Sequence, residues 1–462
     1  MNRPVALAVC VCMAGWVVAQ PPVPPDQRRV LAVEPAAAPV PALKYQLLPE
    51  LAELNPGNAV PAYLKAFAEQ TNFFFKKEAV DERERLLKAP LTEIDASAHK
   101  NYGGHALRQA DFAARLEYAD WNLLPQMREH GYFLLLPEIQ QLRTLANALA
   151  VRGRVQIAGK DYAGAVGTIK SILALGRHLG DHPTIISGLV GVAICHVGLN
   201  VLEELVQQPG APNLYWALTA LPNPLVDTRR GLGAERMMQA SGLGELSSPD
   251  RVWVAGDIPA AIQKGKELIG MAEMPAEDRD GAGPWMAERL KDEAWLTAAR
   301  KLLTDHGFPA DKVAKYPPEQ VLVFKLLLRG RILGDEAIKW MNVPYWQAEA
   351  GMAALVVKGA DIEDRLSRFF VFSIGTVKVA HTRLEQRIAL LRIAEAIRLD
   401  AAKTGKLPAK LSDLSVPVPG DPASGQPCEY KPDGTSAALT GKRIGQAAAA
   451  SYGKYEVKLR LN

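Results

Sequence analysis

The chain has 462 residues, of which 48% are hydrophobic and 23% charged, and its formal net charge is +4. This composition excludes a fibrous chain, a disulfide-rich miniprotein and a polytopic membrane protein. So small a basic excess also argues against nucleic-acid binding, which needs a concentrated basic face. At roughly 150 residues per domain the length predicts about three domains, although helical proteins often run longer as one body.

Residues 1–19 have the pattern of a secretory signal peptide. Arg3 gives a positive start, residues 5–18 form an apolar run, and Val17-Val18-Ala19 fits cleavage after Ala19. The run is shorter than the roughly 20 residues that a spanning helix needs. We therefore expect a secreted or periplasmic protein, with an uncleaved anchor as the open alternative.

A proline-rich segment follows the predicted signal. Residues 20–42 contain seven prolines and no sustained hydrophobic period, which predicts a semi-extended linker and not a domain. Of the four cysteines, Cys10 and Cys12 leave with the signal. Cys195 and Cys428 remain, either as a disulfide or as buried thiols.

From Leu43 onward the dominant hydrophobic period is helical. Apolar residues at three- and four-residue steps predict a helix over 138–158, ended by Gly159, and a second helix that Asp161 caps. The short turn between them makes the two helices antiparallel neighbours. A single such hairpin without a 34-residue repeat does not support a repeat array.

Residues 185–202 form the most hydrophobic stretch after the signal, without a charged side chain unless His196 is protonated. Read by length alone, the stretch is a membrane-span candidate. His196, Asn200 and three glycines favour a buried central helix against which another helix packs closely.

The second half of the chain continues with helices at 259–273, 285–303, 318–340, 345–358 and 371–403, and with loops at 241–258 and 274–284. In the tail, Asp433-Gly434 predicts a β-hairpin and residues 455–461 alternate like a strand. The predicted fold is mainly α: an irregular multi-helix bundle or solenoid-like body with a small C-terminal β element. We divide it into an N-terminal helical domain (43–240), a second helical segment packed on it (241–370), and a long helix with the β tail (371–462).

Several blocks resemble a family of secreted proteins from planctomycete bacteria that has no established activity. The blocks are LKYQLLPELAELNPGNAVPAYLKA (43–66), LEYADWNLLPQMREHG (116–131), LLPEIQQLRTLANALAVRGRVQIAGKDYAGAV (135–166) and the distinctive PNLYWAL (212–218). The resemblance covers most of the chain after the signal, in order. It implies export and a helical architecture, and it brings no catalytic residues to transfer.

The tail is also similar, locally, to the C-terminal half of type II secretion pseudopilins. The similar features are a long helix followed by Gly405, Leu407-Pro408, Asp421-Pro422 and Tyr430. The chain departs from that pattern because no prepilin leader directly precedes this helix and no acidic cluster follows Tyr430. The resemblance therefore implies a shared way of packing a helix on a small sheet and no pilus role.

Two histidine pairings are candidate chemical sites. His178 and His182 have the spacing of metal ligands on a helix, but Gly180 and Pro183 place them at a helix end, which favours a solvated C-terminal cap. Cys195 and His196 are adjacent and therefore point about 100° apart on a helix. We interpret them as a buried thiol beside a hydrogen-bonded core histidine, and not as a thiol–imidazole pair.

Glu117, Asp120 and Trp121 combine carboxylates with an aromatic ring, as glycoside hydrolases do. A spacing of three puts both carboxylates on one helix face, whereas opposed catalytic carboxylates usually come from different elements. Ion pairing with nearby arginines is the favoured interpretation.

No catalytic, cofactor-binding or metal-binding residues are predicted. Two functions remain open: a non-catalytic exported protein that binds another protein or envelope component, and an exported hydrolase with dispersed acidic residues. The first is favoured because no catalytic motif or clustered site stands out in the sequence. We also expect no cofactor, no nucleic-acid partner and no transmembrane helix after the signal.

Overall fold

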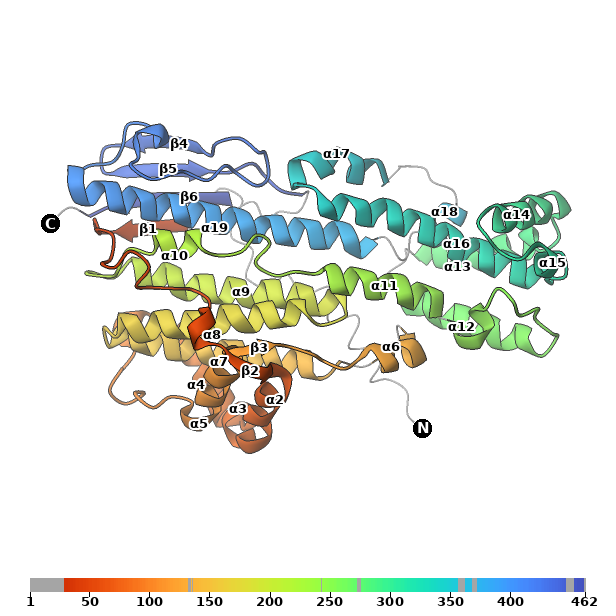
Figure 1. The fold of residues 1–462 in the computed structure, drawn as a ribbon, viewed down its shortest axis with the longest axis horizontal. Coiled ribbons are helices and arrows are strands. Elements are labelled where there is room, and N and C mark those ends of the chain that lie inside the picture. Colours follow the sequence, from red (N-terminus) through yellow and green to blue (C-terminus); the bar gives the residue numbers. More distant parts are fainter. Residues whose placement is uncertain are drawn as a thin grey trace. The chain divides into compact units, whose positions relative to one another are not determined.

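The computed structural model describes residues 29–131, 134, 136–241, 243–271, 276–355, 362–367, 372–445 and 453–460. It is 63% helical with a small sheet, which confirms the prediction of a mainly α protein with a small C-terminal β element (Figure 1). The predicted signal peptide and its cleavage point lie outside the described residues.

The chain divides into two compact units, neither of which is continuous in sequence. The described residues of the larger unit lie within 29–121, 136–231 and 379–460, and those of the smaller unit lie within 122–134 and 232–378. The divisions at 231/232 and 378/379 fall inside helices α11 (Arg229–Ser241) and α19 (Phe372–Thr404).

Three long helices form the centre of the larger unit: α7 (Glu138–Ala158), α8 (Tyr162–Gly180) and α9 (Ile185–Val206). The predicted hairpin between α7 and α8 is confirmed. Gly159 is the C-terminal cap of α7, and Asp161 Oδ1 accepts a hydrogen bond from the backbone N–H of Gly164 at 2.9 Å. This bond satisfies one of the N–H groups that the start of α8 leaves without a helical partner.

Helix α9 is the predicted central helix, and most of it is buried. It is long and apolar enough to cross a membrane by length and composition, and 72% of its apolar window is buried inside the protein. Glycines allow the close packing: a Cβ on Gly191 would lie 2.5 Å from the carbonyl oxygen of Gly176 on α8. Side chains larger than glycine would therefore push the two helices apart.

Shorter elements complete the larger unit. The helices are α2 (Ala59–Glu69), α3 (Thr71–Phe75), α4 (Lys77–Lys88), α5 (Gly104–Ala114) and α10 (Tyr215–Thr219), with 3-10 turns η1 (Leu51–Glu53), η2 (Leu91–Glu93) and η7 (Leu411–Asp413). Strands β2 (Asn55–Asn58) and β3 (Leu116–Tyr118) pair in parallel. A cluster of phenylalanines holds α2 against α3, with the rings of Phe67 and Phe74 4.4 Å apart.

A four-stranded sheet with the strand order β1-β6-β5-β4 brings together the first and last described segments of the chain. Its strands are β1 (Arg29–Val33), β4 (Glu429–Asp433), β5 (Ser436–Thr440) and β6 (Lys454–Leu459). The predicted hairpin at Asp433-Gly434 is confirmed as the β4–β5 turn, and the predicted terminal strand is β6.

Strand β1 corrects the prediction that residues 20–42 are all linker. Residues 29–33 pair in parallel with β6, and Leu31 and Val33 are 1% and 0% exposed. The five residues RVLAV contain no proline and alternate in burial, so they form a strand once a partner is present. The strand could not be predicted because prolines surround it and its partner strand lies more than 400 residues later in the chain.

The smaller unit is helical. Its elements are α6 (Leu124–His130), most of α11, η4 (Gly244–Ser247), α12 (Asp257–Met271), α13 (Ala276–Arg289), α14 (Glu293–Asp305), α15 (Ala310–Val313), α16 (Pro318–Ile338), η5 (Lys339–Asn342), α17 (Tyr345–Leu355), α18 (Ile362–Ser367) and the first residues of α19. Trp253, Leu296 and Phe324 belong to its main described core.

Helix α13 shows that the predicted loop at 274–284 is wrong for residues 276–284. The helix runs through Gly281, Gly283 and Pro284. Ala282 is 2% exposed, and α13 packs against α18. Packing of this kind offsets the cost of glycine and proline inside a helix, which is about 1 kcal/mol for glycine and about 3 kcal/mol for proline. The predicted helix 285–303 is in fact the end of α13 and then α14, because Asp292 caps a new helix by accepting from Trp295 N at 2.9 Å.

Candidate functional site

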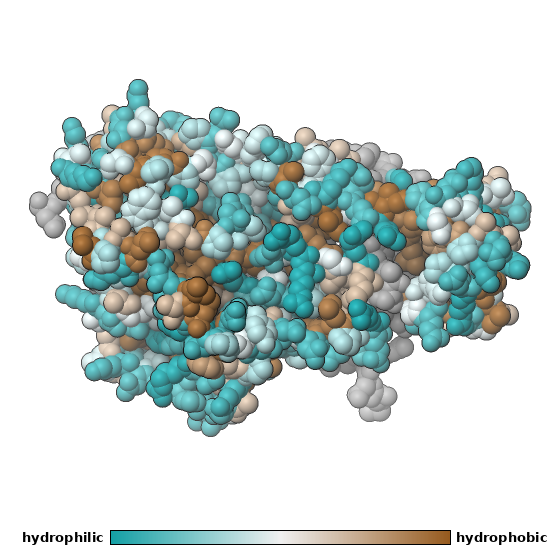
Figure 2. Space-filling view, in the orientation of Figure 1, coloured by the Kyte–Doolittle hydropathy of each residue, from teal (hydrophilic) through white to brown (hydrophobic). Residues whose placement is uncertain are grey.

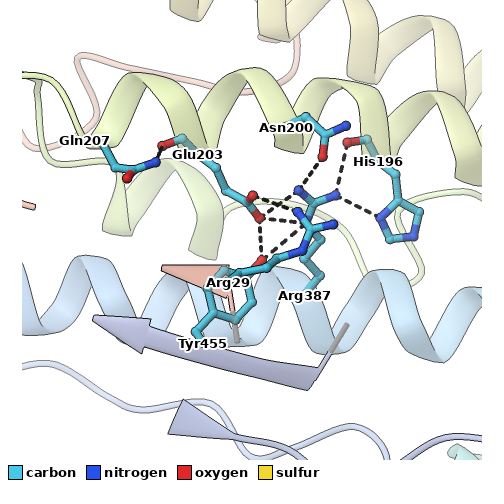
Figure 3. A network of polar contacts seen from close by, with 7 residues as sticks. All are labelled: Arg29, His196, Asn200, Glu203, Gln207, Arg387 and Tyr455. Atoms are coloured by element: carbon cyan, nitrogen blue, oxygen red, sulfur yellow. Dashed lines mark hydrogen bonds and ion pairs between the residues drawn. The ribbon is translucent and has the colours of Figure 1, made fainter. Parts of the chain in front are cut away.

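Buried charged side chains of the larger unit meet in the network shown in Figure 3. Arg387 on α19 is 0% exposed and lies against α9, where Glu203 is 8% exposed. Arg387 Nε donates to Glu203 Oε1 at 2.8 Å, and Arg387 Nη2 lies 2.7 Å from the same oxygen. The two residues are 184 positions apart in the chain.

Strands from both ends of the unit reach the same carboxylate. Arg29 Nη1 on β1 donates to Glu203 Oε2 at 2.8 Å. The phenol of Tyr455 on β6 donates to Glu203 Oε1, and Arg387 Nε lies 3.3 Å from the phenol oxygen. Glu203 therefore joins β1, β6, α9 and α19.

The remaining donors of Arg387 bind two further residues of α9, Asn200 and His196. Arg387 Nη2 donates to Asn200 Oδ1 at 2.7 Å, and Arg387 Nη1 donates to the His196 carbonyl at 3.1 Å. Arg387 Nη1 also lies 3.2 Å from His196 Nδ1. Since a guanidinium can only donate, Nδ1 accepts and the imidazole is neutral with its proton on Nε2.

The ionisation states follow from burial and charge. Burial disfavours the ionised carboxylate, but the charges of Arg387 and Arg29 and the Tyr455 hydrogen bond outweigh it and lower the pKa of Glu203. Burial, and then the charge of Arg387, hold the pKa of His196 well below its usual value. Burial and the Glu203 charge raise the pKa of Tyr455. Near neutral pH the network is thus a fixed arrangement of one carboxylate, two guanidiniums, a phenol and a neutral imidazole.

A second buried ion pair fastens α19 to the chain before α10. Glu395 and Arg398 are each 1% exposed, and Arg398 Nη1 donates to Glu395 Oε1 at 2.7 Å. Glu395 Oε2 accepts from the backbone N–H of Leu214 at 2.6 Å, while Arg398 Nη2 donates to the Ala211 carbonyl at 2.9 Å. These bonds from α19 therefore hold the PNLYWAL block (212–218) in position.

A third buried charge, Asp421, fastens the C-terminal segment to α19. It is 2% exposed, and its Oδ1 accepts from Ala423 N at 3.0 Å and from Gln386 Nε2 on α19 at 2.8 Å. Its other oxygen accepts from Lys442 N at 2.6 Å. These bonds hold the loop before β4 against α19.

The predicted solvated cap at His178 and His182 is wrong for His182, which is 0% exposed. His182 Nδ1 lies 3.1 Å from Thr184 Oγ1, and its Nε2 lies 3.6 Å from Glu138 Oε1 on α7. His178 Nδ1 lies 2.9 Å from the phenol of Tyr63. Trp121 and Glu138, from other parts of the chain, lie against His182. They bury a histidine that the sequence predicts at a solvent-exposed helix end.

Burial controls the protonation of both rings. It lowers the pKa of His178 to about 4, helped by the charge of Arg177. It also lowers the pKa of His182, despite the opposing effect of Glu138. Among the residues that the structure describes, no group of three or more His, Cys, Asp or Glu side chains could hold a metal ion.

The other sequence candidates separate in the structure. Cys195 is 0% exposed and faces Gly176, whereas His196 faces Arg387, so the interpretation as a buried thiol beside a hydrogen-bonded histidine is confirmed. Cys195 and Cys428 are both free and buried, which resolves the alternative left open for them.

Glu117 and Asp120 do not share a helix face, because residues 116–118 form strand β3. Asp120 Oδ1 lies 3.5 Å from Arg230 Nη2, so ion pairing with an arginine is confirmed for this carboxylate. Trp121 Nε1 donates to the His178 carbonyl at 3.2 Å, and its ring lies 4.9 Å from that of His182. The tryptophan is 7% exposed and covers the buried histidine.

Sequence reasoning missed Arg29, Glu203, Arg387 and Tyr455. A charged residue inside an apolar helical pattern is the one signal that could have marked Glu203 and Arg387, since charged side chains are almost never buried unless paired. Comparison with known proteins adds no relative: no family model, no curated protein and no solved structure matches the chain.

Proposed function

We propose that the protein is an exported, non-catalytic binding or scaffold protein of the cell envelope. The observation that carries the proposal is the use of four buried charged groups. Glu203, Arg387, Glu395 and Arg398 are all engaged in ion pairs that fasten α9, α19 and the sheet. Such groups contribute rigidity and a defined conformation, which is what a binding scaffold requires.

The described thiols and buried histidines fit the same role. Burial raises the pKa of Cys195, and burial with the nearby Asp421 raises the pKa of Cys428 to about 12. A thiol that stays protonated is a poor nucleophile. Neutral histidines inside a core serve packing and hydrogen bonding.

Export is proposed from the sequence of residues 1–19 alone. The supporting pattern is the positive start, the apolar run and the small residues before Gln20. Strand β1 begins at Arg29, nine residues after Gln20. A chain cut after Ala19 would therefore retain the whole strand that Glu203 and β6 require.

The test combines processing, location and assembly. Protein recovered from cells that produce it is expected to begin near Gln20, to fractionate with the envelope, and to elute in chemically crosslinked assemblies larger than the 50.1 kDa chain. Recovery in the cytoplasm with Met1 intact overturns export. An uncomplexed chain that hydrolyses envelope polymers overturns the scaffold role and favours the hydrolase alternative.

A further inference from the structure

Helix α18, with the sequence IEDRLS, is a short helix that lies on other helices of the smaller unit. It packs against α16 and α13. We call the surface beneath it the α18 seat and define it by Gly281 on α13, Trp295 on α14, and Lys325 and Arg329 on α16. In Figure 2, apolar atoms are interspersed with hydrophilic ones over the part of the smaller unit where Figure 1 draws α16.

Two ion pairs and a tryptophan hydrogen bond join α18 to its seat. Glu363 accepts from Trp295 Nε1 at 3.1 Å and lies 2.9 Å from Lys325 Nζ. The same Nζ lies 4.0 Å from the centre of the Trp295 ring. Asp364 Oδ1 lies 3.2 Å from Arg329 Nη2. Both ion pairs therefore place the acid on α18 and the base on the seat.

Apolar side chains of α18 complete the match. Ile362 Cδ1 would lie only 3.2 Å from a Cβ on Gly281, so the glycine lets α18 approach α13 closely. Leu366, one turn further along α18, is 9% exposed. The seat therefore accommodates a helix that has two adjacent acids and apolar residues four positions apart.

The seat does not depend on α18 for its own core. The main described core of the smaller unit includes Phe324 and Leu328 on α16, and no described residue of α18 belongs to it. Asp292 caps α14 by accepting from Trp295 N at 2.9 Å, which holds this tryptophan through its own helix. We therefore expect the seat to keep its shape when α18 leaves it.

The seated state of α18 is only marginally favourable. A helix of six residues is too short to be stable without tertiary contacts. The Ser367 hydroxyl is buried and finds no hydrogen-bond partner among the described residues, which costs free energy when α18 is seated. Asp364 and Arg329 are 29% and 41% exposed, so solvent screens their attraction. A competing helix can therefore shift the balance between seated and released α18.

We propose that the α18 seat is the binding surface for a partner protein and that α18 is an internal competitor for it. The partner presents an amphipathic helix of the same chemistry. Two adjacent acids of that helix pair with Lys325 and Arg329, and an apolar residue packs beside Gly281. The inference rests on the proposed binding role and names the kind of partner that this role serves.

The test measures the fluorescence anisotropy of a labelled peptide with the sequence of residues 359–370, added to the purified full chain. Glu363→Lys combined with Asp364→Lys in the chain repels its own α18 from Lys325 and Arg329 and opens the seat. If the seat is open for about 0.1–10% of the time in the unchanged chain, the opened variant binds the peptide about tenfold to a thousandfold more tightly. Equal affinities of the two chains overturn the proposal.

Asp335→Lys is the matched control. Asp335 also lies on α16, but it pairs with Arg236, and the two side chains are 42% and 48% exposed. The control is expected to bind the peptide as weakly as the unchanged chain does.

A second peptide, in which lysine replaces Glu363 and Asp364, tests the role of charge. It is expected not to bind the opened variant, because its lysines face Lys325 and Arg329. If it binds as tightly as the original peptide, charge does not select the occupant and the proposal is overturned.

Hydrogen exchange shows whether the opened variant is still folded. The amides of α14 and α16 are expected to keep their protection, while those of α18 lose it. Loss of protection in α14 and α16 as well would show that α18 is part of the core, which overturns the proposal. Glu363→Gln with Asp364→Asn is a milder variant that keeps the size of both side chains, and it is expected to bind the peptide with an intermediate affinity.

The outcome is separable from that of the proposed function. Absence of peptide binding to the opened variant overturns the role of the α18 seat and leaves the processing and fractionation results standing. A chain that is recovered unprocessed in the cytoplasm, but binds the peptide when opened, supports the seat and overturns export.

Discussion

Arg29 Nη1 lies 2.8 Å from Glu203 Oε2, although the two residues are 174 positions apart. The pair brings the first described strand to the central helix, and β1 then pairs with β6 near the other end of the chain. Ala32 N also donates at 3.2 Å to Oε1 of Gln207, the residue that follows α9, so the end of α9 binds the outer edge of β1. The two ends of the larger unit therefore depend on one another through α9.

Removing a single partner from the buried ion pair is expected to be strongly destabilising. Arg387→Met leaves Glu203 as a buried carboxylate with less compensation, which costs about 3–5 kcal/mol. Urea denaturation measures the loss in free energy of unfolding. Hydrogen exchange of the α9 amides shows whether the loss lies in the larger unit.

Lys88→Met is the control for that experiment. Lys88 pairs with Glu84 at 3.4 Å, but the two side chains are 79% and 61% exposed. Solvent screens such a pair, so the loss is below about 1 kcal/mol. Equal losses in the two variants would show that the Arg387 pair is not structural.

Strand β1 is expected to contribute to the core in spite of its place next to prolines. Leu31 is 1% exposed and lies opposite Val457 on β6. Leu31→Ala therefore costs about 2–5 kcal/mol and lowers the exchange protection of the β6 amides. Val30→Ala changes a side chain that is 46% exposed and should leave that protection intact. If the two variants behave alike, β1 is not a core strand.

The local features were predictable from the sequence and the distant ones were not. Gly159 and Asp161 act within four residues of their own helices, so the hairpin could be read from spacing alone. The partners of Glu203 come from 174 residues before it and from 184 and 252 residues after it. No single-sequence period reports contacts at such separations. Burial of His182 was missed for the same reason, because Trp121 and Glu138 cover it from other elements.

Because His178 is buried and neutral, we expect the free energy of unfolding of the larger unit to fall as pH is lowered. The unfolded chain binds a proton at each histidine near pH 6.5, whereas burial lowers the pKa of His178 to about 4. The unfolded state therefore binds more protons between these values. Stability falls as pH is lowered through this window, by up to about 1.4 kcal/mol per pH unit for this group. His178→Gln is expected to remove that part of the slope.

Urea midpoints from pH 4 to 7 measure this difference, with Tyr63→Phe as the control. The control removes the phenol that lies 2.9 Å from His178 Nδ1 and leaves the imidazole in place. Burial raises the pKa of Tyr63, so the phenol itself does not titrate in this window. A stability difference between the unchanged protein and His178→Gln that is constant with pH contradicts the prediction.

The two cysteines are expected to be unreactive thiols in the folded protein. Cys195 is 0% exposed and Cys428 is 6% exposed, and burial raises the pKa of both. Alkylation needs an accessible thiolate, so iodoacetamide at pH 8 should label both residues in denaturant without reductant and neither in the native state. Val40→Cys places a thiol at a position that is 89% exposed and provides a rapidly labelled internal reference. Fast native labelling of Cys195 would mean that α8 and α9 separate in solution, since the thiol lies where Gly176 lets the two helices pack.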